Sequence, residues 1–163
     1  MKKHTHLPVY SVGPLYVAVI AALTLAAVLT RNTPALASGK LDGLAIPLRI
    51  LGIAFIAGGM ALWVYAVPIS KIDDGIRENR LVTAGAYALV RNPIYSAAML
   101  ACTGVILIIG NAWLFPLPLV YWLFMTVLMK ATEEKWLKDL YGAEYEVYCG
   151  RVNRCWPWFP KGN

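Results

Sequence analysis

The chain has 163 residues, the length of a single domain, and 59% of them are apolar, above the roughly 45–50% of soluble domains. This composition excludes an ordinary soluble protein and predicts an integral membrane protein. The formal net charge is +6. Because basic residues orient membrane proteins and meet anionic headgroups, this charge does not call for nucleic acid, and no nucleic-acid partner is expected.

The apolar runs predict an all-α integral membrane protein with about four transmembrane helices in one membrane domain, residues 1–163. The predicted spans are residues 14–30, 44–68, 94–109 and 112–130. The last two form a tight helical hairpin at Gly110-Asn111, although each arm is short for a perpendicular crossing of the about 30 Å hydrocarbon core. In the second span, Gly58-Gly59 is available for close helix contact, and Arg49 is expected to anchor one end by snorkelling to the interface.

The first run has a second interpretation, a cleavable signal peptide. Lys2 and Lys3 precede the run, and Ala35-Leu36-Ala37 imitates a small-residue cleavage site. The run between Leu15 and Thr30 is long and uncharged, and the Ala-Leu-Ala sequence lies far from the start. We therefore expect this segment to remain as a span.

Basic residues are distributed unequally between the predicted loops. Two precede the first span, four lie in residues 70–93 and six lie from Lys130 onward, against two in residues 31–43. The positive-inside rule then places both termini in the cytoplasm. The chain is expected to be a multi-pass protein, with a prokaryotic cell membrane as the expected location.

Cysteines and histidines give no sign of a metal site. The three cysteines, Cys102, Cys149 and Cys155, form no CxxC pair, and an odd number gives no disulfide framework. His4 and His6 lie in the N-terminal tail without a nearby carboxylate or cysteine. No metal is expected.

Polar residues that carry chemistry gather on the predicted cytoplasmic side. Tyr87 and Tyr95 flank a turn before the hairpin, although interfacial tyrosines also occur in membrane proteins without activity. Glu133 and Glu134 follow the last span, where a carboxylate near the hydrocarbon is costly unless it is partnered or hydrated. Neighbours on a helix point about 100° apart, so we expect one glutamate to face a pocket and the other to meet water or Lys138. The residues that follow, 136–142, predict an interfacial helix ending at a glycine.

Five blocks in order make the sequence resemble the isoprenylcysteine carboxyl methyltransferase and phospholipid methyltransferase family, especially its compact prokaryotic members. The resemblance covers roughly residues 70–160. The blocks are Leu81-Val82-Thr83-x-Gly85-x-Tyr87, Val90-Arg91-Asn92-Pro93-x-Tyr95, Glu133-Glu134 with Leu137, Tyr141-Gly142-x-Glu144-Tyr145-x-x-Tyr148, and Val152-x-Arg154-x-x-Pro157.

This resemblance implies a methyltransferase that uses S-adenosylmethionine, releases S-adenosylhomocysteine and acts on a lipid or lipidated acceptor by in-line transfer. The implied cofactor region is residues 79–95 plus 130–157. For an amine acceptor, which must lose a proton, Glu134 is the candidate base. The implied cofactor-binding residues are Asn79, Arg80, Leu81, Val82, Tyr87, Asn92, Pro93, Ile94, Tyr95 and Glu133.

Two positions depart from the family pattern. Asn92 stands where many members have histidine, and it cannot titrate near neutrality. Met129 stands where the eukaryotic isoprenylcysteine enzymes have an arginine, with Lys130 one position further on, and this counts against carboxyl methylation. An NADPH-dependent reductase of the sterol reductase type and a non-catalytic relative are the alternatives.

Overall fold

The computed structural model describes residues 12–67 and 81–158, and the regular secondary structure of these residues is helical. Three helical segments, 13–30, 42–66 and 112–141, are long and apolar enough to cross a membrane, and residues 93–109 form a shorter apolar helix. The prediction of an all-α membrane protein is confirmed. The helices are α1 (Gly13–Thr30), α2 (Ala45–Ala66), α4 (Ala86–Leu89), α5 (Pro93–Ile109), α6 (Pro116–Ala131), α7 (Glu133–Tyr141) and α8 (Ala143–Arg151), with short 3-10 helices at Pro34–Gly39, Asp42–Leu44 and Ala112–Leu114.

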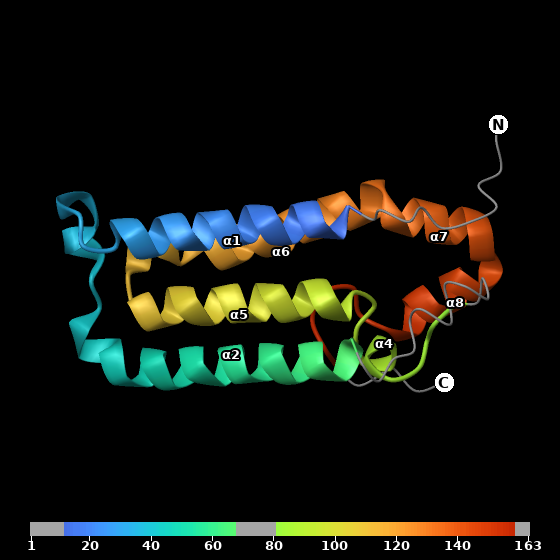
Figure 1. The fold of residues 1–163 in the computed structure, drawn as a ribbon, viewed down its shortest axis with the longest axis horizontal. Helices are drawn as coiled ribbons and strands as arrows, with labels where there is room; N and C mark the ends of the chain where they lie inside the picture. The colour runs from blue at the N-terminus through green and yellow to red at the C-terminus, as the bar shows by residue number, and fades with distance from the viewer. Residues whose placement is uncertain (1–11, 68–80, 159–163) are drawn as a thin grey trace.

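The four long helices α1, α2, α5 and α6 run side by side as an elongated bundle (Figure 1). In this arrangement α5 is central, because it packs against α1, α2 and α6. Helices α4, α7 and α8 gather at one end of the bundle, and the α1–α2 connection lies at the other end, beside the α5–α6 turn. The molecule therefore has two distinct polar ends joined by an apolar middle.

Helices α2 and α5 approach each other closely because glycines face each other. A Cβ placed on Gly52 would lie 2.6 Å from the carbonyl oxygen of Gly104, and one on Gly59 would lie 2.7 Å from that of Ala97. Small residues at helix contacts are typical of membrane bundles, in which association depends on close packing. Of the predicted Gly58-Gly59 pair, only Gly59 lies at the contact, since a Cβ on Gly58 would meet nothing within 4 Å.

The break at Gly110-Asn111 ends α5 and begins the return to α6, as predicted. Gly110 has a φ of 63°, a left-handed conformation that favours glycine, and its N–H bonds the carbonyls of Ile106 and Leu107. Asn111 is 1% exposed, and its Nδ2 donates to the Leu36 carbonyl at 2.7 Å. The turn is thereby fastened to the α1–α2 connection.

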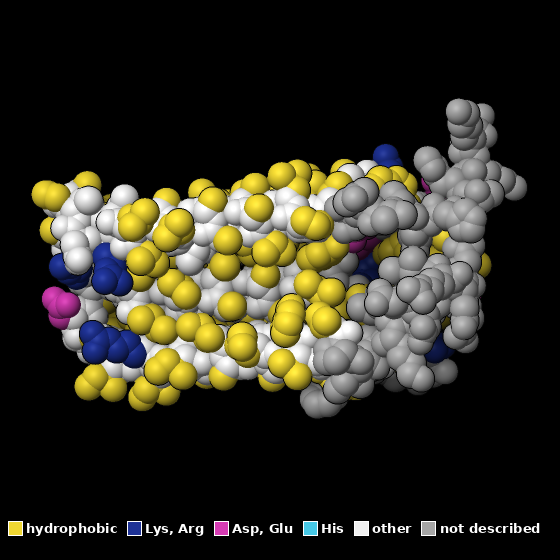
Figure 2. All heavy atoms as spheres, viewed as in Figure 1, with side chains coloured by type: hydrophobic (Ala, Val, Ile, Leu, Met, Phe, Trp, Pro, Cys, Tyr) yellow, Lys and Arg dark blue, Asp and Glu magenta, His cyan; other side chains and the backbone are white. Residues whose placement is uncertain are grey.

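The main apolar core lies between α1, α5 and α6 and includes Tyr16, Ile106, Tyr121 and Met125. Hydrophobic side chains also cover the face of the bundle that Figure 2 shows. Leu29, for example, is 73% exposed, Ile46 72% and Val127 65%. A bilayer permits an apolar outer surface over an apolar core, because the exposed apolar side chains contact lipid hydrocarbon and not water.

Helix α6 ends at Ala131, one residue after the predicted end of the last span. At Thr132 the backbone leaves helical geometry, with φ −126° and ψ −87°, so Glu133 opens a new helix, α7. The helix predicted over residues 136–142 corresponds to α7, which ends before Gly142 as expected, and a further helix, α8, follows this glycine, where φ is 54°. This bend turns α8 back toward α4 (Figure 1).

Candidate functional site

Three segments from different parts of the chain meet at one end of the bundle: the turn that contains α4, the helices α7 and α8, and the C-terminal segment that follows α8. The segment after α8 runs alongside residues 89–92. The Arg91 N–H donates to the Asn153 carbonyl at 2.8 Å, and the Trp158 N–H donates to the Leu89 carbonyl at 3.0 Å. The Asn92 side chain adds a bond from Nδ2 to the Arg154 carbonyl at 3.2 Å. The C-terminal segment therefore fixes the turn that leads into α5.

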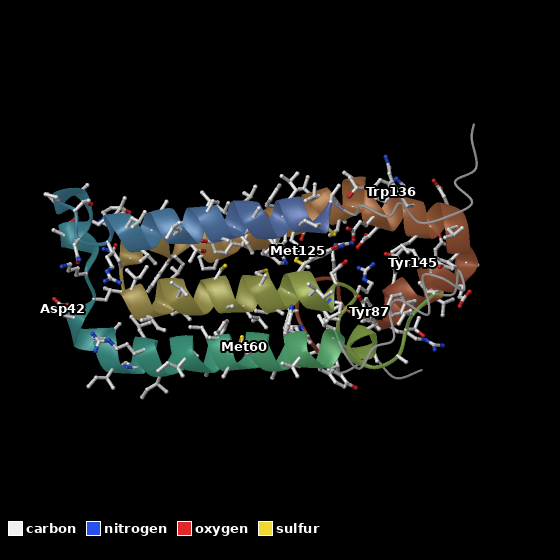
Figure 3. The ribbon with its side chains drawn as sticks, in the orientation of Figure 1. Asp42, Met60, Tyr87, Met125, Trp136 and Tyr145 are labelled. Atoms are coloured by element: carbon white, nitrogen blue, oxygen red, sulfur yellow. The ribbon has the colours of Figure 1, made fainter. Side chains whose placement is uncertain are left out.

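Local sequence explains how this turn forms. Gly85 has a φ of 63°, which a residue with a side chain adopts only at a cost, and it starts the one-turn helix α4. Pro93 then opens α5, where its missing N–H costs nothing. Leu81 packs on a cluster formed by Tyr145, Tyr148 and Val152. The chain thus returns to the bundle with Tyr87 and Tyr95 on either side of the turn (Figure 3 labels Tyr87).

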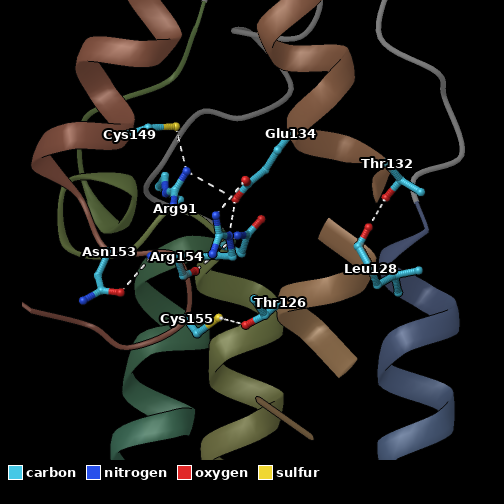
Figure 4. A network of polar contacts seen from close by, with 10 residues as sticks. Arg91, Thr126, Leu128, Thr132, Glu134, Cys149, Asn153, Arg154 and Cys155 are labelled. Atoms are coloured by element: carbon cyan, nitrogen blue, oxygen red, sulfur yellow. Dashed lines mark hydrogen bonds and ion pairs between the residues drawn. The ribbon is translucent and has the colours of Figure 1, made fainter. Parts of the chain in front are cut away.

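Glu134 is the centre of an ion-pair network (Figure 4). Arg154 donates to it twice, from Nε to Oε1 at 2.5 Å and from Nη2 to Oε2 at 2.9 Å, and Arg91 Nη1 lies 3.2 Å from Oε1. The Arg91 and Glu134 side chains are 9% and 14% exposed, so this carboxylate and its partner are largely withdrawn from water. Arg91 Nη1 also donates to Cys149 Sγ at 2.6 Å. The hydrogen bond to Glu134 raises the pKa of the Arg154 guanidinium above its usual value.

Glu133 takes part in a separate contact. Tyr95 donates its hydroxyl to Glu133 Oε1 at 3.1 Å. Burial, and then the charge of Glu133, raise the pKa of Tyr87 to about 12, so this phenol stays protonated at neutral pH. The Tyr148 hydroxyl donates to the Tyr87 carbonyl at 2.7 Å and holds its backbone. A carboxylate and two phenols are therefore brought near one another at the start of α7.

The start of α1 supports this group. The rings of Tyr16 and Tyr95 pack edge to face with centroids 6.2 Å apart. A Cβ on Gly13 would overlap the Tyr95 ring, so only glycine lets α1 begin this close to it. Tyr95 is consequently held from the α1 side as well as by Glu133.

The two glutamates that begin α7 contact different partners. Glu133 turns to α5 and Glu134 to the C-terminal segment, and both are half-buried. The expectation that one of them meets water or Lys138 is corrected here, because Lys138 pairs with Glu146 at 2.7 Å. Glu134 is paired with Arg154 and Arg91 instead.

The remaining predicted site residues are distributed over this end of the molecule. Asn79 and Arg80 lie outside the described residues. Leu81 and Val82 are half-buried, and Pro93 is buried. Ile94 packs on the core between α2, α4 and α5. Met129 is buried and Lys130 is exposed, so neither continues the arginine pattern of the eukaryotic enzymes.

Sequence reasoning did not name Arg91, Arg154, Cys149 or Gly13 as site residues. Both arginines stood inside matched blocks, and the need of two adjacent carboxylates for cationic partners was a usable signal. Gly13 lies outside the region of resemblance, and only the packing of α1 on Tyr95 reveals it. Across residues 12–67 and 81–158 no group of three or more metal-ligating side chains occurs.

The fold and site define a class: a multi-helix membrane protein with a carboxylate, tyrosine and arginine site at one end of its bundle. Residues 47–144 match the family model for phospholipid methyltransferases. Because the match covers more than half of the chain, the chain belongs to this family of membrane methyltransferases. The matched region extends from α2 into α8 and includes Arg91, Glu133 and Glu134. No curated protein and no solved structure matches the chain significantly.

Proposed function

We propose that the protein transfers a methyl group from S-adenosylmethionine to a lipid or lipidated acceptor in the membrane. The observation that carries this proposal is the contact of Tyr95 with Glu133, beside Tyr87, within the region that matches the family. A carboxylate balances the positive charge of a sulfonium, and phenol rings and hydroxyls suit an adenine and a ribose. The half-buried backbone of Leu81 and Val82 adds amide donors and acceptors from the facing loop.

The residues of this site bind and align, and no covalent enzyme intermediate is needed. S-adenosylmethionine supplies an activated methyl group: an acceptor lone pair would form a bond to the methyl carbon as the bond from that carbon to sulfur breaks, and S-adenosylhomocysteine would leave with a neutral thioether sulfur. An amine acceptor would release its proton to water before it attacks. Glu133 would balance the charge of the sulfonium, and Tyr95 holds the Glu133 carboxylate in place through its hydrogen bond. The methyl carbon on the sulfonium would then face the acceptor in one direction. Alignment at about 3–3.5 Å from the attacking atom accounts for a large share of catalysis in such displacements.

We further propose that Glu134 acts as a positioning residue. Sequence order suggested it as the base for an amine acceptor, but Arg154 occupies both of its oxygens and Arg91 approaches one of them. A carboxylate with two guanidinium partners is a poor proton acceptor, since protonation would leave both cations without their counter-charge. In its observed position Glu134 joins the turn before α5 to the C-terminal segment.

The surroundings of α6 favour an amine-bearing lipid over a prenylcysteine carboxylate as the acceptor. An acceptor carboxylate calls for a cation that is not already paired. The position one turn before Glu133 holds the buried, apolar Met129, and Arg91 and Arg154 are paired with Glu134. The lipid-facing bundle surface gives an apolar acceptor a route from the bilayer. With both termini cytoplasmic, as the cation distribution predicts, S-adenosylmethionine reaches this end from the cytosol.

Methyl transfer is tested with purified protein in nanodiscs that contain a bacterial lipid extract and S-adenosylmethionine with a deuterated methyl group. Lipid mass spectrometry then searches for labelled species. The expected result is labelling of one headgroup class, abolished in Glu133→Gln and retained in Asp139→Asn, which changes an exposed aspartate on α7 outside the matched blocks. No labelled lipid in any fraction, together with NADPH consumption by the same sample, would refute the proposal in favour of the reductase.

A further inference from the structure

A second polar hollow lies at the opposite end of the bundle, remote from the glutamates. It is a cavity of about 470 Å³ between the end of α1, the α1–α2 connection, the start of α2 and the end of α5. Arg31, Lys40 and Arg49 line it together with Asp42, and Ile108 and Ile109 give it an apolar wall. Figure 2 shows Lys and Arg side chains gathered beside an acidic side chain at this end of the bundle.

The charge of this hollow is unbalanced. Three cations face one carboxylate, and among the described residues none of the three forms a salt bridge. The cations come from separate elements: Arg31 follows α1, Lys40 lies in the connection and Arg49 lies in α2. Cations that converge without counter-ions form a ready site for an anion, and two guanidiniums suit phosphate oxygens in particular.

The backbone around Lys40 is held in place. Lys40 forms an isolated antiparallel bridge with Asn111, and the Leu41 N–H donates to the Gly110 carbonyl at 2.9 Å. Asn111 in turn holds the Leu36 carbonyl. The α1–α2 connection and the hairpin turn therefore form one unit, which keeps the cationic hollow open at a fixed place on the bundle.

The position of the hollow relative to the membrane indicates the kind of anion. Arg49 lies in a helix whose neighbouring residues Ile46 and Ile50 are 72% and 65% exposed, and Leu29 at the end of α1 is 73% exposed. An arginine at such a boundary is costly unless it snorkels or finds an anion. On the topology predicted from the cation counts this is the non-cytoplasmic end, where orientation requires no cations. A ligand with an anionic head and apolar chains matches both surfaces.

We propose that this hollow binds the phosphate headgroup of an anionic phospholipid, in the leaflet opposite the methyl-transfer site. Arg31, Lys40 and Arg49 contact the phosphate oxygens, and the acyl chains lie along the apolar outer faces of α1 and α2. The bound lipid joins the two helices at the end where the short connection leaves them. The site is independent of the methyl acceptor and of the proposed reaction.

The test is native mass spectrometry of the full chain, released from detergent with dioleoyl phosphatidylglycerol or dioleoyl phosphatidylcholine. The variant Arg31→Gln/Lys40→Gln/Arg49→Gln removes the cations, and Lys130→Gln/Lys135→Gln/Arg151→Gln removes equal charge from exposed positions at the other end. At about fivefold per basic residue, the first variant is expected to bind phosphatidylglycerol about a hundredfold more weakly, and the second to bind it as the wild type does.

Three results would overturn the proposal. Equal binding of both lipids by the wild type would remove the headgroup preference, and equal loss in both variants would show only diffuse charge attraction. Displacement of phosphatidylglycerol by an equal concentration of glycerol phosphate would identify a soluble phosphate in place of a lipid. If the triple variant does not fold, Lys40→Gln and Arg49→Gln singly are each expected to weaken binding about fivefold, and unchanged binding in both would again refute the site.

Discussion

The network around Glu134 gives the most direct test of how the site is built. Glu134→Gln keeps the shape of the side chain but removes its charge, so that Arg154 and Arg91 face each other without a counter-ion. Hydrogen bonds to charged groups contribute about 1.5–3 kcal/mol each, and breaking a buried pair costs about 3–5 kcal/mol. Glu134 is 14% exposed, so part of this penalty is relieved by water. We expect the free energy of unfolding to fall by about 3 kcal/mol.

The assay is equilibrium unfolding in detergent, followed by far-UV circular dichroism, with a double-mutant cycle on Glu134→Gln and Arg154→Gln. The two substitutions remove the same bidentate contact, so the double variant is expected to be more stable than the sum predicts, by about 1–2 kcal/mol. Glu146→Gln is the matched control. This variant breaks the ion pair between Glu146 and Lys138, whose side chains are 58% and 63% exposed, respectively. It is expected to leave the free energy of unfolding unchanged.

Additive effects in this cycle would contradict the network, as would an unfolding free energy for Glu134→Gln equal to that of the wild type. Kinetics separate positioning from base catalysis. A positioning role predicts weaker binding of S-adenosylmethionine and an unchanged pH profile in Glu134→Gln. A base role predicts normal binding, slow turnover and loss of the acidic limb of that profile.

Three further outcomes follow from single contacts. Tyr148→Phe removes the hydrogen bond that the Tyr148 hydroxyl donates to the Tyr87 carbonyl, and it is expected to lower the free energy of unfolding by about 1 kcal/mol. Tyr141→Phe removes a hydroxyl that has no partner among the described residues, and it is expected to leave the free energy of unfolding unchanged. Equal losses for the two variants in urea unfolding would contradict this. Gly52→Ala forces α2 away from α5 and is expected to lower the free energy of unfolding by about 1–3 kcal/mol. The methyl group of Gly58→Ala meets open space, so this variant is expected to be as stable as the wild type or slightly more stable. Thermal melts of the two variants in parallel test this, and equal melting temperatures would refute it. Because the pKa of Tyr87 is about 12 in the folded protein, against an ordinary value of about 10, its contribution to stability is complete below pH 10 and is lost as pH rises through about 12. The wild type is expected to lose stability relative to Tyr87→Phe as the pH rises from 10 to about 12, and a difference that stays constant over this range would exclude the shift.

The helices were predictable because apolar runs of bilayer length have few alternatives. The break at Gly110-Asn111 was predictable from the sequence because a glycine marks it. Only glycine adopts the left-handed conformation of this turn easily. The last span was predicted to end at residue 130, within one residue of the end of α6 at Ala131, but the departure of the backbone from helical geometry at Thr132 was not predicted. No glycine or proline marks it, and the preferences of the residues around it favour a continuous helix.

The site was predictable as a set of residue types but not as a set of pairs. Tyr95, Glu133 and Glu134 stood out because aromatic and acidic residues at a membrane boundary need partners. The pairing of Glu134 with Arg154 joins residues whose distance in the fold no local pattern fixes. The contact of Gly13 with Tyr95 is likewise a result of tertiary packing alone.

The central claim is that the group around Tyr95 and Glu133 binds S-adenosylmethionine, and isothermal titration calorimetry of the protein in nanodiscs tests it most directly. Separate titrations use S-adenosylmethionine, S-adenosylhomocysteine and NADPH, with Tyr95→Phe and Glu133→Gln as variants. We expect binding of both adenosyl ligands and none of NADPH, with affinity for S-adenosylmethionine falling about tenfold in each variant through loss of a charge-assisted contact. Binding of NADPH alone, or adenosyl binding that neither variant changes, would contradict this assignment.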